Sequence, residues 1–230
     1  MRRGLLYISA LCLALAASAA GQSPATGRVI GRLRLTTKVP GKPLASTAYP
    51  RRTVGDHDAP ALPEIRNVVV YIKDAVYRGP LPIKRAELRQ EHETFIPHTV
   101  AITRGSSVEF PNGDPFFHNV FSLSHAANFN LGRYERGQSR TREFTKAGTV
   151  KVYCDIHSHM SATILVFDHP YFTIPDMDGT FELPAVPAGE YTIVGWHERV
   201  GERAERIRVE AGKTASIELT VPVPAGGIAP

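Results

Sequence analysis

The chain has 230 residues, of which 43% are hydrophobic and 21% charged, and it carries a formal net charge of +5. This composition excludes a disordered or collagen-like chain and predicts one or two globular domains. The charge is too small to indicate a nucleic-acid-binding protein. The 19 Gly and 18 Pro interrupt the chain too often for long helices, which excludes a helical bundle and predicts an all-β fold.

Residues 1–20 have the three parts of a secretory signal peptide. Two arginines form a basic start, an apolar run occupies 5–17, and small residues fill 17–20. The run is shorter than the roughly 20 apolar residues of a membrane-spanning helix, and no later stretch approaches that length. We therefore expect a periplasmic or secreted protein with no membrane span, cleaved near residues 19–21.

Two strands and a loop follow the leader. Alternating apolar residues predict a half-buried strand at 28–35, and an apolar run predicts a more buried one at 67–72. Between them, residues 37–63 contain five prolines and no hydrophobic period. Such a length without periodicity predicts a mobile loop.

Cysteine use is unusual for an exported chain. Cys12 lies inside the apolar run and leaves with the leader, so Cys154 has no partner within the mature chain. Exported proteins usually pair their cysteines as disulfides. Three roles remain open for Cys154: packing in the core, a bridge to another chain, or a thiolate that holds a metal or takes part in chemistry.

The strand predicted at 150–154 is followed by a loop that carries soft metal ligands. Alternation along this strand places Cys154 on the same buried face as two valines. His157 and Met160 follow at intervals of three, a spacing at which a tight loop can turn both side chains back toward the strand end. Thiolate, imidazole and thioether are three of the four ligands of a trigonal His2Cys copper site with a weak axial Met.

A second imidazole lies upstream. Residues 107–121 predict a strand, a polar turn and another strand, with His118 at the loop edge. The pattern V-x-F-x-N and H-N-V, followed about 36 residues after His118 by C-x2-H-x2-M, resembles the cupredoxin (blue-copper) family, with a short ligand loop that is most similar to that of amicyanin. The resemblance covers residues 84–167 and implies a plastocyanin-like Greek-key β-sandwich with one copper ion.

The resemblance also implies a role for each matching residue. The copper ligands are a set of four, with three in the equatorial plane and the methionine on the axis: His118, Cys154, His157 and Met160. Asn119 ties the two ligand loops together, and Asn112 is expected beside the ligands. Zinc also binds thiolate and imidazole, but a structural zinc site favours four strong ligands over a thioether.

The ligand loop departs from the amicyanin pattern. It reads D-I-H-S-H, whereas amicyanin-like loops carry proline on either side of the histidine. His159 offers a longer, azurin-like spacing, but that register needs a methionine where this chain has Thr163. We therefore place His159 at the rim, and we expect Phe116 and Phe117 to surround the site as a docking surface, although strand alternation makes it equally reasonable that one of the two belongs to the core.

Four such ligands leave no open coordination position, which hydrolytic and oxygen-activating sites require. We therefore expect no enzyme but an exported mononuclear type 1 (blue) copper protein that exchanges one electron with a redox protein partner. The alternative is a copper-holding or surface-docking (adhesion) protein whose metal is structural or delivered onward. The chain has only three methionines, so it lacks the Met-rich tract expected for copper delivery.

The C-terminal part resembles a second family. The stretch D-x-D-G-x-F-x-L-x-x-V-P-A-G-x-Y at 176–191 resembles the carboxypeptidase regulatory-like (transthyretin-like) β-sandwich, whose opening strands, G-x-V-x-G and N-V-V-V-Y, occur here before the copper segment. We therefore expect a discontinuous sandwich of 26–76 and 168–223, into which the copper domain at 84–167 is inserted. The alternative is that the early strands extend the cupredoxin sheet. Proteins similar in this way are labelled methylamine utilisation proteins.

The second module carries no catalytic motif that we recognise, so a scaffold or docking role is expected. At its Trp-His-Glu tripeptide, alternation predicts strand core followed by an end-of-strand polar pair, His197 and Glu198. The remaining histidines lie among polar or turn residues and are expected to face solvent: His57, His92, His98, His125 and His169.

Overall fold

The computed structural model describes residues 25–35 and 63–221. The predicted signal peptide lies outside the described residues, as does the predicted loop at 37–63 apart from its last residue. Within the described part, the only regular elements besides β-strands and an isolated bridge form one short 3-10 helix, η1 (Glu64–Asn67), so the predicted all-β class is confirmed. No helix in these ranges is long and apolar enough to cross a membrane.

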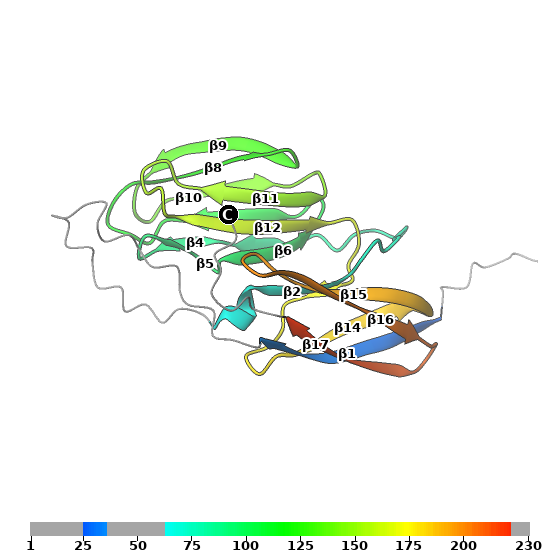
Figure 1. Ribbon diagram of the computed structural model, residues 1–230. Helices are drawn as coiled ribbons and strands as arrows, with labels where there is room; N and C mark the ends of the chain where they lie inside the picture. Colours follow the sequence, from blue (N-terminus) through cyan, green and yellow to red (C-terminus); the bar gives the residue numbers. More distant parts are fainter. Residues whose placement is uncertain (1–24, 36–62, 222–230) are drawn as a thin grey trace, which may run out of the picture.

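Residues 85–167 form one β-sandwich with a small hairpin at its side (Figure 1). The larger sheet contains, in spatial order, β6 (Thr99–Thr103), β12 (Ser161–Phe167), β11 (Gly148–Tyr153), β8 (His118–Ser124) and β9 (Ala127–Tyr134). The smaller sheet contains β10 (Ser139–Glu143), β7 (Ser107–Pro111) and β3 (Arg85–Glu87), and the hairpin pairs β4 (Arg89–Glu91) with β5 (Thr94–Ile96). Alternate strand residues point between the sheets, because side chains in a strand alternate between its two faces, and they form one apolar core that includes Phe110, Val152 and Ile164.

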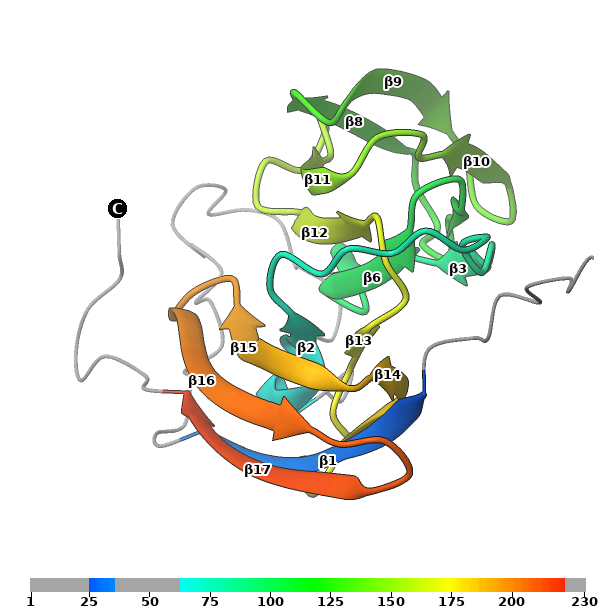
Figure 2. The same ribbon diagram turned by 90° about the vertical axis from the view of Figure 1, so that its right-hand side faces the viewer.

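The remaining strands form two further sheets around a second core. One sheet contains β14 (Thr180–Pro187), β1 (Thr26–Leu35) and β17 (Thr214–Val221), and the other contains β13 (Phe172–Thr173), β2 (Val68–Ile72), β15 (Gly189–His197) and β16 (Gly201–Val209). Figure 2 shows the first strand and the last strand side by side in the outer layer. The layers approach closely at Gly195, where a Cβ atom would lie 3.0 Å from Leu33.

The two early strands therefore pair with late strands. β1 pairs with β14 and β17, and β2 pairs with β13 and β15, so the early strands do not extend the sheet that contains His118. The discontinuous sandwich of 26–76 and 168–223 and its resemblance to the regulatory-like family stay predictions.

A carboxylate and an aromatic cluster join the two sandwiches. Glu198, in the turn after β15, accepts hydrogen bonds from His98 (2.8 Å) and Thr163 (2.7 Å) and a short contact from Lys151, all three from the other sandwich. The ring of Phe167, at the end of β12, also packs on two rings of the other sandwich, with centroid distances of 5.1 Å to Tyr71 and 4.6 Å to Phe172. The interface is therefore both apolar and charge-paired.

These contacts correct two expectations about histidines. His98 binds Glu198 instead of facing only solvent, and His169 is buried and stacks on Tyr171. His92 and His125 are exposed, as expected. His57 lies outside the described residues. The error arose because polar sequence neighbours say nothing about the second sandwich that covers these side chains.

Candidate metal centre

Two neighbouring strands bring the predicted ligands to one end of the larger sheet. His118 is the first residue of β8, and Cys154 directly follows β11. These antiparallel strands are paired at Phe121 and Tyr153, so the start of one lies beside the end of the other. The loop between β11 and β12 then carries His157.

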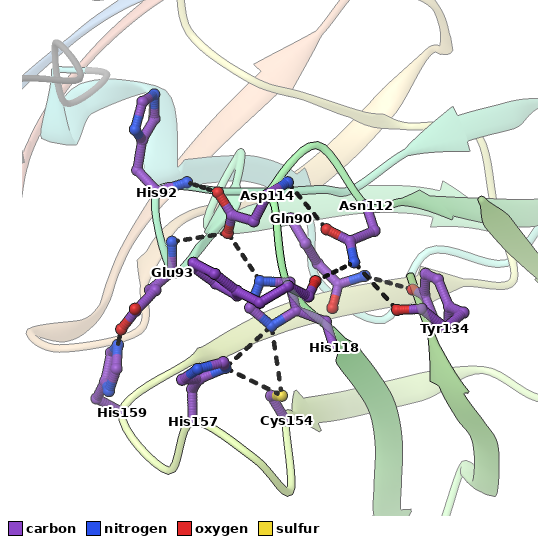
Figure 3. A network of polar contacts seen from close by, with 11 residues as sticks. Gln90, His92, Glu93, Asn112, Asp114, His118, Tyr134, Cys154, His157 and His159 are labelled. Atoms are coloured by element: carbon purple, nitrogen blue, oxygen red, sulfur yellow. Dashed lines mark hydrogen bonds and ion pairs between the residues drawn. The ribbon is translucent and has the colours of Figure 1, made fainter. Parts of the chain in front are cut away.

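Three ligand atoms converge there (Figure 3). The distance from Cys154 Sγ is 3.8 Å to His118 Nδ1 and 4.0 Å to His157 Nδ1, and the two nitrogens are 3.1 Å apart. All three residues are at least 95% buried. In the described part of the chain, this is the one group of three or more His, Cys, Asp or Glu side chains close enough to hold a metal ion.

The size of this triangle fits a metal ion. A point about 2.0–2.1 Å from both nitrogens and about 2.3 Å from the sulfur, which are the distances of zinc sites, lies within the triangle and close to its plane. A near-planar set of two imidazoles and one thiolate is the equatorial arrangement of copper electron-transfer centres. The residues present therefore fit such an ion in both donor type and spacing.

The surroundings of Cys154 favour the thiolate that a metal requires. Burial raises the pKa of the Cys154 thiol, but the contact with His118 and the backbone amides of Asn119, Ile156 and His157 outweigh burial and hold this pKa below its ordinary value. Cys154 therefore forms the metal-binding thiolate more readily than an ordinary buried thiol does.

The pKa of His118 is shifted by the same group of contacts. Burial lowers its pKa, but the carboxylate of Asp114 and the sulfur of Cys154 more than compensate and raise the pKa of His118 to about 9. The pKa of Asp114 is lowered: burial raises it, but the hydrogen bonds from His118 and from the amides of Glu93 and His92 outweigh burial. Without metal, the centre therefore holds a proton that metal binding must displace.

Comparison with known proteins identifies the family through a curated relative and not through a family model. No family model matches the chain. A curated plastocyanin from Ulva prolifera is 32% identical over 83 residues, which cover 31% of this chain and 85% of that relative. The chain belongs to the cupredoxin family. The match to plastocyanin covers too little of the chain to include both sandwiches.

Several solved structures are similar to part of the chain. Amicyanin from Paracoccus versutus is 22% identical and covers 38% of this chain and 85% of its own, with a TM-score of 0.34. A copper-containing nitrite reductase from Thermus scotoductus SA-01 is 25% identical over 42% of this chain, with a TM-score of 0.35. The chain spans only 24% of that reductase.

Asn119 connects the two ligand loops of this cupredoxin site. Its side-chain oxygen accepts a hydrogen bond of 3.4 Å from the amide of Asp155, and its side-chain nitrogen donates to Asn130 (2.7 Å) and Gly132 (3.2 Å). The hydrogen bond with Asp155 joins the strand that begins at His118 to the loop that begins at Cys154. This geometry is what the predicted role of Asn119 requires.

Asn112 lies in the loop that precedes His118. Its oxygen accepts from the amide of Asp114 (2.9 Å), and its nitrogen donates to the carbonyls of Phe116 (2.9 Å) and Tyr134 (3.1 Å). Asn112 therefore shapes the loop before His118 through both ends of its side-chain amide, and its role beside the ligands stays a prediction. Gln90 continues this buried network with a short hydrogen bond to the Tyr134 hydroxyl.

Met160 closes the ligand loop through its backbone. Its amide donates to the carbonyl of His157 (2.9 Å), and its carbonyl accepts from the amide of Cys154 (3.3 Å). The side chain is buried in the apolar core. These bonds place Met160 at the end of a tight turn that begins at Cys154, while its role as axial ligand stays a prediction.

The residues predicted for the docking surface separate into two kinds. The Phe116 ring lies 5.3 Å from the rings of both His118 and His157, whereas Phe117 is 53% exposed. His159 lies at the rim, with its Nε2 atom 3.5 Å from the carboxylate of Glu93. Phe116 therefore packs on the ligands, and Phe117 and His159 are the members accessible from outside.

Sequence reasoning missed two carboxylates at the centre. Asp114 belongs to an N-G-D-P stretch that indicates only a turn, although its place four residues before His118 was an available signal. Glu93 lies on the β4–β5 hairpin, distant in sequence from both ligand loops, and nothing in its local pattern indicates the site.

Proposed function

We propose that this protein is an exported, mononuclear type 1 (blue) copper protein that carries single electrons between redox protein partners. The observation that carries the proposal is the buried triangle of one thiolate sulfur and two imidazole nitrogens in a chain of the cupredoxin family. Bound copper would supply one-electron exchange between Cu(I) and Cu(II).

The protein's own residues would hold one geometry for both oxidation states. Cys154, His118 and His157 would be the equatorial ligands and Met160 the axial one. The three equatorial residues are almost completely buried, and the backbone turn from Cys154 to Met160 fixes the loop. A rigid, dry pocket limits reorganisation on electron transfer, and it leaves no vacant position for a substrate. For this reason we propose a carrier and not an enzyme.

The exposed rim is the proposed route for electrons. His157 lies beside the half-buried Phe116, and Phe117 and Ile156 present apolar surface next to it. Such a patch suits a small, transient contact with a redox partner. The second sandwich, fixed to this one through Glu198, would serve as a scaffold or docking module.

Copper loading tests the proposal. The purified chain is titrated with Cu(II), and the visible spectrum is recorded. We expect an intense blue thiolate-to-copper band that reaches its maximum at one equivalent and disappears reversibly on reduction. Cys154→Ser should lose the band, whereas Ser158→Ala in the same loop should keep it.

A nearly colourless copper complex would contradict the carrier. If copper binds without the band but moves readily to a competing chelator, the copper-holding alternative is favoured instead. Retention of the band in Cys154→Ser would show that another ligand set binds the metal.

A further inference from the structure

The turn of the β4–β5 hairpin has an unusual backbone. Its two central residues, His92 and Glu93, have φ values of +55° and +52°. Two-residue hairpin turns with both φ values positive favour Asn and Gly, because other side chains crowd the backbone in this region. Something outside the hairpin must therefore stabilise this turn.

Asp114 binds both amides of that turn. The amide of His92 donates to Asp114 Oδ1 (2.7 Å), and the amide of Glu93 donates to Asp114 Oδ2 (2.9 Å). The loop and the hairpin are joined again by the amide of Gly113, which donates to the carbonyl of Gln90 (2.8 Å). The hairpin thus holds the Asp114 carboxylate in one orientation (Figure 3).

The same carboxylate contacts His118 on the side away from the metal centre. Asp114 Oδ2 lies 2.7 Å from His118 Nε2, and the two side chains are 7% and 0% exposed. An ionised carboxylate only accepts hydrogen bonds, so His118 Nε2 must carry the proton. In the neutral imidazole that binds a metal, the other nitrogen, Nδ1, is then the unprotonated one, and it faces Cys154 and His157.

We propose that Asp114 is a positioning residue of the metal centre: its carboxylate, held by the β4–β5 turn, orients His118 with Nδ1 toward the ion and places a buried negative charge behind this ligand. Carboxylates that bind the outer nitrogen of a ligand histidine fix its tautomer and make it a stronger donor. The inference rests on the proposed copper function.

The hairpin also reaches the second ligand loop. The carboxylate of Glu93 lies 3.5 Å from His159 Nε2, two residues beyond His157. One hairpin that contributes no ligand therefore contacts both loops that do. Through these contacts the hairpin would help to fix the distance between the imidazoles of His118 and His157.

The buried charge has a measurable consequence. A carboxylate next to the site stabilises Cu(II) more than Cu(I), because Cu(II) has the higher charge. Asp114→Asn keeps the size of the side chain and removes the charge. We expect the preference for Cu(II) over Cu(I) to fall about tenfold, which raises the reduction potential by about 59 mV for one electron. Zinc affinity should fall about 10- to 100-fold.

The experiment compares three variants in parallel by voltammetry and by zinc titration. Asp114→Asn should show both changes, and Asp114→Glu should recover most of the potential because it restores the charge. Glu135→Gln removes one exposed charge from the same sandwich and should change neither quantity. If Asp114→Asn has the same potential and zinc affinity as Glu135→Gln, the inference is wrong.

A measurement on the unmodified protein covers the case in which Asp114→Asn does not fold. In the zinc-loaded chain, nitrogen-15 NMR should show a slowly exchanging proton on His118 Nε2 and none on Nδ1. A proton on Nδ1 would overturn the inference while the copper function stands. If the unmodified chain binds neither copper nor zinc through Cys154, both the proposed function and this inference fail.

Discussion

The two sandwiches are built from the same kind of core but differ at their strand ends. Each has alternating strands that bury aliphatic side chains between two sheets. In the cupredoxin sandwich, however, buried polar groups converge at one end, where Asp114, His118 and His157 lie together. In the other sandwich, the buried His197 contacts the carboxylate of Glu64 and accepts a hydrogen bond from the amide of Arg199. The comparison teaches that a β-sandwich by itself implies no function, which resides in the loops at its ends.

The largest effect is expected when one buried histidine in each sandwich is replaced by alanine. His157→Ala should abolish the blue band and lower copper affinity at least 100-fold, because it removes an equatorial ligand. His197→Ala should keep the band but reduce the free energy of unfolding by about 1–3 kcal/mol, since Glu64 loses a partner. Copper titration and urea denaturation measure the two effects. Loss of the band in His197→Ala would show that the sandwiches do not differ in this way.

A core substitution asks whether the second sandwich supports the metal centre. Leu183 is 1% exposed in the second core, so Leu183→Ala should lower the free energy of unfolding by about 2–5 kcal/mol through lost burial and a residual cavity. The spectrum of the folded protein should be unchanged. Urea denaturation followed at the blue band and by circular dichroism checks both statements, and a shifted band in the absence of urea would mean that the two cores are coupled.

The interface carboxylate predicts a dependence on pH. Burial raises the pKa of Glu198, but His98, Lys151 and Thr163 outweigh it and hold this pKa far below its ordinary 4.5. Because the folded-state pKa is the lower one, the stabilisation is fully present above about pH 4.5 and is lost as the pH falls further. Glu198→Gln should therefore destabilise the protein at pH 7 by about 1–3 kcal/mol, with a smaller difference from the unmodified chain in acid. An equal difference at pH 7 and pH 3 would contradict this account.

The smallest effect is expected on the outer sheet of the second sandwich. Arg28 and Glu182 form an exposed ion pair at 2.6 Å. Exposed pairs contribute little because water and salt screen them. Arg28→Ala should therefore leave the urea midpoint unchanged within error, and a clear shift would show that this surface is less solvated than its exposure indicates.

Much of the architecture follows from local patterns. Alternation over 28–35 and 150–154 predicted β1 and β11, because a half-buried strand must alternate wherever it lies. The spacing of the predicted ligands was readable for a similar reason: His118 and Cys154 each lie at a strand end, and His157 lies in the short loop that follows Cys154. The structure brings these three side chains together.

The supporting contacts were not readable, because they join residues that are distant in the chain. Asp114 binds an amide 21 residues away at Glu93, and Glu198 binds His98 across 100 residues. The sequence alone determined the strands, the class of fold and the ligand candidates, since these depend on periodicity and on residue type. Only the tertiary structure decided which nitrogen of His118 faces the centre and how the two sandwiches are joined, because a hydrogen bond depends on where two distant segments meet.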